Sequence, residues 1–191
     1  MALTPETIRR LLSEREPRTL SAEDRLVAAV LVPMIWHGEE PHLLFTQRTE
    51  TVRHHQGQIS FPGGHRDPGD PDLIHTALRE AHEELGLPPS DVEVLGRLSD
   101  YLTRTSIHHL TPIVGHVHRV PGRWVLQEDE VAEAFEVPLT DLLDPSIEGI
   151  YEWTWEGRRG TTPAFRWQGR LIWGATAEML VDFLGLLRGR G

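Results

Sequence analysis

The alternation of apolar and polar residues divides the chain into strands and amphipathic helices. Residues 26–36 and 42–48 are rich in Val, Leu and Ile or alternate apolar with polar positions, which predicts two strands joined by a turn at 37–41. Apolar residues at helical spacing predict helices over the ranges 5–14, 71–85 and 176–187.

The other segments complete an α+β pattern. Residues 49–70 are mostly loop, and further elements are expected as strands at 92–101, 110–118 and 122–127, helices at 128–135 and 139–143, and a hairpin at 151–174. Because several consecutive strands are joined by short turns rather than helices, we expect a mixed β-sheet between helices. The length of 191 residues suits one domain, 1–191, with an N-terminal helical extension at 1–24.

Composition narrows the function classes. The chain has no cysteine, so any bound metal must be held by oxygen or imidazole, and a cytoplasmic location is expected. The charged N-terminus does not resemble an export signal, and the apolar run at 26–36 is too short to span a bilayer. A net charge of −10 disfavours a nucleic-acid binder. We therefore expect a small-molecule substrate and neither membrane nor nucleic acid as a partner; the oligomeric state stays open.

The predicted helix at 71–85 has terminal signals at both ends. Asp70 is expected to cap it with Pro71 in the first turn, and Gly86 supplies the stop. At about 100° per residue, one stripe of the helix should face the core. That stripe consists of Ile74, Ala77, Leu78, Ala81 and Leu85.

Three acids, Glu80, Glu83 and Glu84, fall on the side of the helix opposite this stripe. Such spacing is often only a solvated face. However, like charges four residues apart repel, and only Arg79 is near enough to offset them. A divalent cation would relieve the repulsion, and clustered carboxylates suit Mg²⁺ or Mn²⁺.

The stretch from Gly64 to Leu87 resembles the Nudix box, G-x5-E-x7-R-E-U-x-E-E-x-G-U, where U is aliphatic. The positions that match in order are Gly64, Arg79, Glu80, Ala81, Glu83, Glu84, Gly86 and Leu87. In two departures from the pattern, Asp70 stands at the first acidic position, and eight residues rather than seven separate it from Arg79.

Similarity to Nudix hydrolases implies an α/β/α sandwich and hydrolysis of a nucleoside diphosphate linked to another group. The resemblance assigns Glu80 and Glu84 as the main ligands of Mg²⁺ or Mn²⁺, with Glu83 completing the cluster directly or through water. Arg79 would orient the glutamates. The backbone of Gly63 and Gly64 would bring amides to the substrate and a carbonyl to the metal.

Residues 44–64, LFTQRTETVRHHQGQISFPGG, resemble the signature of the coenzyme A pyrophosphatase branch of that family, L-L-T-x-R-S/T-x3-R-x3-G-x3-F-P-G-G. The matching positions are Leu44, Thr46, Arg48, Thr49, Arg53, Gly57, Phe61, Pro62, Gly63 and Gly64, and Phe45 replaces the second leucine. This resemblance implies cleavage of coenzyme A, or a close derivative, into 3′,5′-ADP and 4′-phosphopantetheine.

The same segment places donors beside the acidic helix. Arg48, Arg53, His54, His55 and Gln58 would make a basic loop, which a substrate with several phosphates needs. The alternative is an ordinary surface loop, above all for the two histidines.

A general base is sought in the acidic run at 127–130, and Glu130 is the preferred candidate. The alternative is an acidic start to the helix expected at 128–135. His108 and His109 are expected at a polar strand edge rather than on a phosphate. Tyr151, Trp153 and Trp155 alternate onto one strand face, where a core or interface role is preferred to stacking on adenine.

Two alternative functions stay open. One is a Nudix hydrolase for another nucleoside diphosphate derivative, such as ADP-ribose or NADH. The other is a non-catalytic binding module of the same fold, against which stands the presence of all four charged residues from Arg79 to Glu84.

Overall fold

The computed structural model describes residues 2–49, 57–103, 108–155 and 157–189. The elements of the first half are α1 (Pro5–Ser13), β1 (Leu26–His37), β2 (Glu40–Arg48), β3 (Ile59–Ser60), β4 (Gly63–His65), α2 (Leu73–Leu85) and η1 (Pro89–Asp91). Those of the second half are β5 (Val92–Arg97), β6 (Tyr101–Leu102), β7 (His108–Val117), β8 (Val131–Pro138), α3 (Leu139–Leu142), η2 (Pro145–Ile147), β9 (Glu148–Trp155), β10 (Arg158–Trp167), β11 (Arg170–Trp173) and α4 (Gly174–Leu187).

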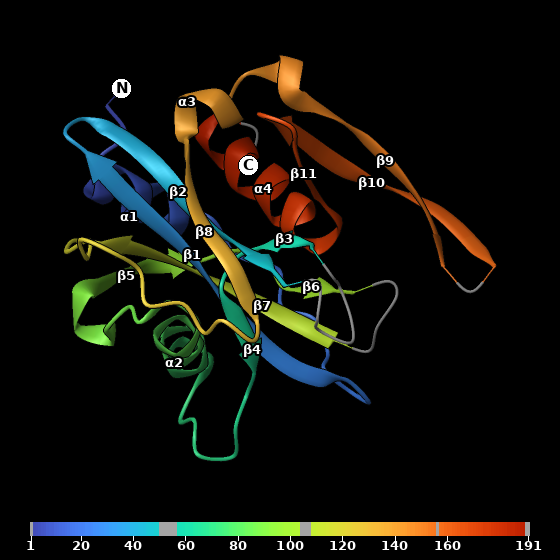
Figure 1. Ribbon diagram of the computed structural model, residues 1–191, viewed down its shortest axis with the longest axis horizontal. Coiled ribbons are helices and arrows are strands. Elements are labelled where there is room, and N and C mark those ends of the chain that lie inside the picture. Colours follow the sequence, from blue (N-terminus) through green and yellow to red (C-terminus); the bar gives the residue numbers. More distant parts are fainter. Residues whose placement is uncertain (1, 50–56, 104–107, 156, 190–191) are drawn as a thin grey trace.

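An 8-stranded mixed sheet forms the centre of the molecule (Figure 1). Its main path is β3-β2-β1-β7-β5, while β4 pairs with β1, β6 with β7, and β8 with β2. The pair β1 and β7 is parallel, and the other pairs are antiparallel. The expected mixed sheet is confirmed.

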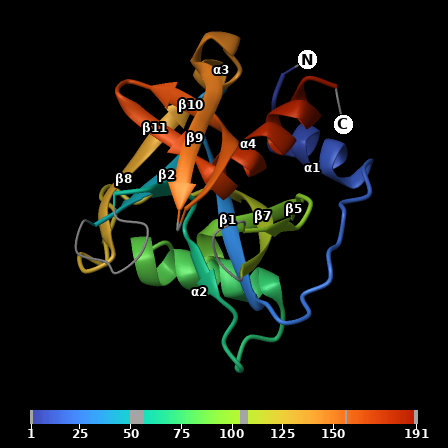
Figure 2. The same ribbon diagram turned by 90° about the vertical axis from the view of Figure 1, so that its right-hand side faces the viewer.

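Alternate residues of the central strands face two helical layers. On one face, Ile35 and Leu44 share a buried cluster with Ala81 of α2. On the other, Met34 shares a cluster with Phe183 of α4, and the same cluster takes in side chains of α1. Figures 1 and 2 show α2 on one side of the sheet and α1 with α4 on the other. The fold is the expected α+β, α/β/α arrangement.

The aromatic-rich tail forms a separate 3-stranded antiparallel sheet in the order β11-β10-β9. Its alternation was predicted as a hairpin, and the register confirms this with Arg158 opposite Trp155 and Trp167 opposite Arg170. Phe165 and Ile172 are buried in the cluster that contains α4. The second sheet is therefore attached to the α4 side of the main sheet.

The strand expected at 122–127 is absent from the described structure. Instead, the amide of Val125 donates to the carbonyl of Leu85 and that of Gln127 to Glu84, both at 3.0 Å. The last carbonyls of a helix have no partner within the helix. This segment provides hydrogen-bond donors to the carbonyls at the end of α2. Its alternation of apolar and polar residues reflects packing against that helix rather than pairing as a strand.

The helix expected at 128–135 is also wrong, because residues 131–138 form strand β8. Its residues include good helix formers, but β8 pairs with β2 along an otherwise open edge. Phe135 lies opposite Phe45, and their rings stack with centroids 5.8 Å apart. Pairing and aromatic packing outweigh a weak local helix propensity here.

No helix among the described segments is long and apolar enough to cross a membrane.

Candidate functional site

The glycine pair of β4 lies where side chains cannot fit. A Cβ on Gly63 would come within 2.4 Å of the Ala29 carbonyl oxygen in β1. A Cβ on Gly64 would come within 2.5 Å of the Glu80 carboxylate. The backbone of β4 therefore approaches an acidic side chain of α2 as closely as only glycine allows.

The N-terminus of α2 begins two residues later than expected. Asp72, not Asp70, is the N-cap, and its carboxylate accepts from the His75 amide at 2.8 Å. Gly86 ends the helix in the left-handed conformation, as expected, with φ 67°. Asp70 therefore does not cap the helix.

Asp70 is instead a buried anchor for Arg79. Asp70 is 4% exposed, and its carboxylate accepts from Arg79 Nε at 3.1 Å and Nη2 at 3.0 Å. Thr76 Oγ1 and the Asp67 amide also donate to it. Hydrogen bonds from Arg79 hold the pKa of Asp70 well below its usual range. The residue at the unusual spacing therefore fixes the arginine of the motif.

Arg79 distributes its other donors over the acidic cluster. Its Nη1 donates to Glu80 Oε1 at 2.8 Å and to Glu83 Oε2 at 3.0 Å, and its Nη2 reaches the His65 carbonyl at 2.9 Å. One guanidinium thus ties α2 to β4 and orients two glutamates. Arg79 was expected to orient the glutamates, and it is hydrogen-bonded to two of the three.

The buried stripe of α2 is rotated relative to the expectation. Ala77, Ala81 and Leu85 are buried as expected, but Ile74 is 40% exposed. Glu84, expected on the polar side, is only 5% exposed. The buried face differs from the predicted one because this part of the helix faces β4 and the cleft rather than solvent. The Glu84 carboxylate is therefore buried at a position that the helical period predicted to be exposed.

Burial dominates the electrostatics of Glu84. It raises the pKa of Glu84 to about 8, with Glu80 and Glu130 adding repulsion and Arg48 and the Gly63 amide opposing the shift. Burial raises the pKa of Glu80 as well, and contacts with Arg79 oppose that shift. Within the described segments, Oε2 of Glu84 is buried and has no hydrogen-bond partner.

We expect the protein without divalent ions to lose stability as pH rises from about 4.5 to about 8, because the folded state holds the Glu84 proton that the unfolded state releases. Above that window the Glu84 contribution is constant. Denaturant unfolding in a chelator at several pH values measures the slope. Glu84→Gln is expected to flatten it, and an unchanged slope in that variant would contradict the assignment.

These carboxylates line a cleft of about 900 Å³. Glu80, Glu83 and Glu84 lie on its wall together with Glu130. Glu130 precedes β8, its side chain is 43% exposed, and its Oε2 is 3.8 Å from Arg48 Nη2. The structure thus brings the candidate base beside the three acids of α2, although the helix proposed to carry it does not exist.

Two described residues of the predicted basic loop line the cleft. Arg48, at the end of β2, and Gln58 line the cleft, and the Arg48 amide donates to the Gln58 carbonyl at 2.9 Å. Arg53, His54 and His55 lie outside the described residues.

The cleft also contains residues that the sequence did not single out for it. His65 and His108 stack with centroids 4.8 Å apart at its wall, so His108 is not simply a strand edge. Its neighbour His109 is 5% exposed, which also contradicts the expected polar edge. The position of His65 directly after the glycine pair could have indicated that it lies at the cleft. Nothing in the sequence around His108 indicated the same for that residue.

The cleft also has an apolar wall. It is formed by Leu102, Leu110, Trp153, Trp173 and Met179. Trp153 packs against Gly160, where an added Cβ would come within 2.4 Å of the indole. Tyr151 packs on Trp173 instead, with centroids 4.5 Å apart. Trp153 thus faces the cleft, where the sequence favoured a core or interface role.

Comparison with known proteins gives matches in sequence and in fold. The family described as NUDIX domain matches residues 25–154. The uncharacterized Nudix hydrolase NudL of Yersinia pestis (strain Pestoides F) is 43% identical over 154 residues, which cover 80% of this chain and 75% of that protein.

Two solved structures have the same fold. A MutT/nudix family protein from Enterococcus faecalis has a TM-score of 0.55 at 12% identity and covers 94% of this chain and 68% of its own. The binary complex of the C. elegans Ap4A hydrolase has a TM-score of 0.50 at 21% identity, and the match covers 62% of this chain and 83% of that one.

Proposed function

The chain belongs to the NUDIX family of hydrolases, which act on pyrophosphate bonds, and from this premise we propose that it cleaves the diphosphate of coenzyme A or a close derivative. The products would be 3′,5′-ADP and 4′-phosphopantetheine. The observation that carries the proposal is the meeting of two motifs at one cleft. Arg48 and Gln58 from the coenzyme A-like segment line the same cavity as Glu80 and Glu84 from the Nudix box.

The acidic side chains of the cleft fit a hard divalent ion. Glu84 has a buried carboxylate oxygen without a hydrogen-bond partner in the described segments, and a carboxylate in that state is costly unless it is protonated or paired with a cation. Glu80 lies against the backbone of Gly64, where a side chain would fill the space beside its oxygens. Oxygen donors in such a set suit Mg²⁺ or Mn²⁺.

Glu80 and Glu84 would hold this ion, with Glu83 and the Gly64 carbonyl completing the set. When bound, the ion neutralises charge on the diphosphate and lowers the pKa of water. Arg79 would keep the glutamates oriented through the hydrogen bonds to Glu80 and Glu83. Supporting groups of this kind typically change metal affinity or activity by about 10- to 100-fold.

Glu130 would act as the general base. It would accept a proton from the attacking water at a carboxylate oxygen while the water oxygen bonds to one phosphorus and the bridging oxygen leaves with the other phosphate. Its place in the cleft supports this role, and its Oε1 is held by Gln127 Nε2 at 3.4 Å. Because no covalent enzyme intermediate is needed, the absence of cysteine is no obstacle.

Cations and amides would position the anionic substrate. Arg48 and Gln58 would contact the phosphates from the end of β2, and the Gly63 backbone would present an amide. The roles proposed for Arg53 and His54 extend the same donor set to the 3′-phosphate of coenzyme A. Charge-assisted hydrogen bonds from arginine suit these groups in strength and geometry.

The apolar wall supports a substrate with uncharged parts on either side of its diphosphate. Trp153 and Trp173 offer aromatic faces that suit an adenine ring or a pantetheine arm. Trp173 and Met179 lie beyond residue 154, where the family match ends. We therefore propose that the chain acts as one catalytic unit, with β11 and α4 contributing to substrate choice.

A product assay tests the proposal. Coenzyme A, coenzyme A without its 3′-phosphate, ADP-ribose and NADH would be incubated in parallel with Mg²⁺ or Mn²⁺, and the products identified by mass. We expect the highest kcat/KM with coenzyme A. Equal rates without the 3′-phosphate would remove the role given to the basic loop. A preference for ADP-ribose or NADH would favour a Nudix hydrolase for another nucleoside diphosphate derivative. Substrate binding without product formation at any metal concentration would favour a non-catalytic binding module.

Arg48→Gln is expected to raise KM for the preferred substrate about 10-fold or more, since a hydrogen bond from a charged donor is worth roughly 1.5–3 kcal/mol. Steady-state kinetics measures the change. Arg119→Gln, at a side chain 79% exposed outside the cleft, is the matched control and should leave KM unchanged. An unaltered KM in the Arg48 variant would place this arginine outside the substrate site.

A further inference from the structure

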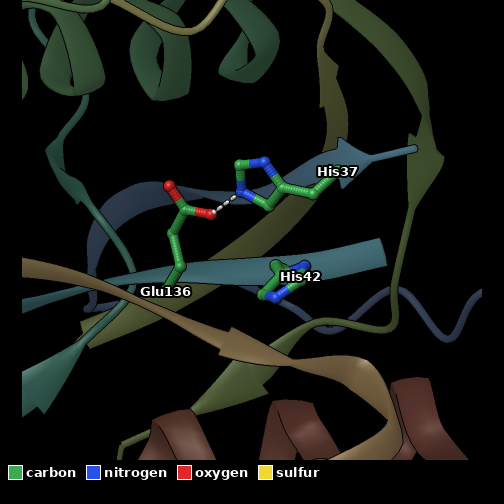
Figure 3. A group of neighbouring side chains, drawn as sticks. All are labelled: His37, His42 and Glu136. Atoms are coloured by element: carbon green, nitrogen blue, oxygen red, sulfur yellow. Dashed lines mark hydrogen bonds and ion pairs between the residues drawn. The ribbon is translucent and has the colours of Figure 1, made fainter. Parts of the chain in front are cut away.

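Three possible metal ligands meet at the opposite end of the sheet from the cleft. His37 at the end of β1, His42 in β2 and Glu136 in β8 each offer a nitrogen or oxygen, and these atoms all lie within 4.8 Å of one another. Figure 3 shows His37 and Glu136 pointing toward each other, with His42 beside them. No role for this group follows from either sequence motif.

Strand register places the three side chains on one face. Ile35 is opposite His42, and Leu44 is opposite Glu136. Because side chains alternate along a strand, His37 shares the face of Ile35, and His42 shares that of Leu44. Ile35 and Leu44 pack with α2, so the group continues the α2 face of the sheet past its apolar part. Tertiary pairing, not sequence spacing, brings these residues together.

The hydrogen bonds of His37 and His42 allow one nitrogen of each ring to offer a lone pair to a metal ion. His42 Nδ1 lies 3.2 Å from the Glu40 carbonyl, which can only accept, so Nδ1 carries the hydrogen and Nε2 of the neutral ring keeps its lone pair. A backbone carbonyl on the second nitrogen is the usual support of a metal-binding histidine. His37 Nε2 donates to Glu136 Oε2 at 2.6 Å and can pass its hydrogen to Nδ1 by changing tautomer.

The spacing needs only small movements to hold an ion. Ligand atoms about 2.0–2.1 Å from a tetrahedral zinc are roughly 3.3 Å apart. The 2.6 Å contact between His37 and Glu136 would have to open slightly, and the wider separations, up to 4.8 Å, would have to close. Rotation of His37 can supply this change, because its side chain is 53% exposed.

The donor set differs in kind from that of the cleft. Two imidazoles and one carboxylate suit Zn²⁺, Ni²⁺ or Cu²⁺, whereas Mg²⁺ prefers oxygen alone. Val30 of β1 lines the cleft, and His37 lies seven positions further along the same strand, about 23 Å away if the strand is extended. An ion at this end would therefore not be part of the catalytic centre.

We propose that His37, His42 and Glu136 form a second metal site, selective for a borderline transition ion such as Zn²⁺, with water as the remaining ligand. The bound ion links the β1–β2 hairpin to β8, three segments that come together only in the folded chain. It stabilises the folded state, since such a preformed site is absent from the unfolded one.

The experiment titrates Zn²⁺ alone into the full-length Glu84→Gln variant by calorimetry, so that the cleft contributes as little as possible. One ion per chain is expected, with a rise in melting temperature. In the long-range nitrogen–proton NMR spectrum, the Nε2 signals of His37 and His42 should shift. Mg²⁺ should neither raise the melting temperature nor shift these histidine signals. Because the background lacks Glu84, one of the proposed cleft ligands, and the readouts follow His37 and His42, failure here is distinguishable from failure of the proposed hydrolase.

Matched variants complete the test. His42→Gln and Glu136→Gln, each in that background, are expected to weaken Zn²⁺ binding at least tenfold and to abolish the melting shift. His82→Gln removes an exposed histidine of α2 and should change neither. Equal affinity in His42→Gln and His82→Gln, or perturbation of histidines scattered elsewhere, would overturn the proposal, as would no binding by the folded parent. Circular dichroism checks that each variant folds.

Discussion

Glu84→Gln is expected to lower turnover by about a thousandfold or more while the protein keeps its fold. The ion that Glu84 would hold supplies several kcal/mol of transition-state stabilisation, and about 1.4 kcal/mol corresponds to a factor of ten in rate. Glutamine has nearly the same shape but carries no charge. Single-turnover kinetics at saturating Mg²⁺, with a parallel Mn²⁺ titration, measures the loss.

Stability separates this effect from misfolding. In a chelator above pH 8, Glu84→Gln should be more stable than the parent, because it removes a buried carboxylate whose oxygen lacks a partner in the described structure. Glu93→Gln, at a side chain 51% exposed on the surface, is the control and should retain activity. Normal turnover in Glu84→Gln would remove the metal role from this carboxylate and with it the proposed mechanism.

Arg79→Met is expected to lower the free energy of unfolding by about 3 kcal/mol and activity by about 10- to 100-fold. The substitution leaves Asp70, with a side chain 3% exposed, as a buried charge without its cation. It also frees Glu80 and Glu83 from their shared donor. Denaturant unfolding and steady-state kinetics measure the two losses separately.

Two comparisons identify the cause. Arg9→Met breaks an exposed ion pair with Glu93 and should cost less than about 1 kcal/mol. Adding Asp70→Asn to Arg79→Met should recover part of the stability, because the stranded charge is gone, but none of the activity. Recovery of both would show that Arg79 acts only on stability. An unfolding free energy equal to that of the parent would contradict the anchoring role of Asp70.

The same pair predicts the response to acid. The depressed pKa of Asp70 contributes stability that is present above the ordinary aspartate range and is lost as pH falls through that range toward the folded value. The parent should therefore lose stability more steeply in acid than Asp70→Asn does. The slope of stability against pH below about pH 4 should be smaller in Asp70→Asn than in the parent.

Much of the site could be predicted from sequence because its geometry is local. Glu80, Glu83 and Glu84 lie within two turns of one helix, and Gly86 ends that helix where it was expected to. The helical period fixes such neighbours without reference to the rest of the chain. Strands β1 and β2 were predicted for the same reason, since their apolar content and alternation depend on few neighbours.

Errors arose where partners distant in the chain decided the outcome. Residues 131–138 became a strand because β2 offered an edge, and Asp70 became an anchor because Arg79 lies nine residues away across the start of the helix. Glu84 is buried although it stands outside the apolar period. Local propensities amount to tenths of a kcal/mol per residue, which tertiary pairing and buried charge readily exceed.

The sequence by itself determined the family, the α+β class, the acidic helix and the motif that precedes it. Only the tertiary structure decided that Glu130 and Arg48 share a cleft with those acids, that Trp153 lines the same cleft, and that His37, His42 and Glu136 converge elsewhere. The physical reason is that helical and strand periods act over a few residues, whereas sheet pairing joins segments up to a hundred residues apart.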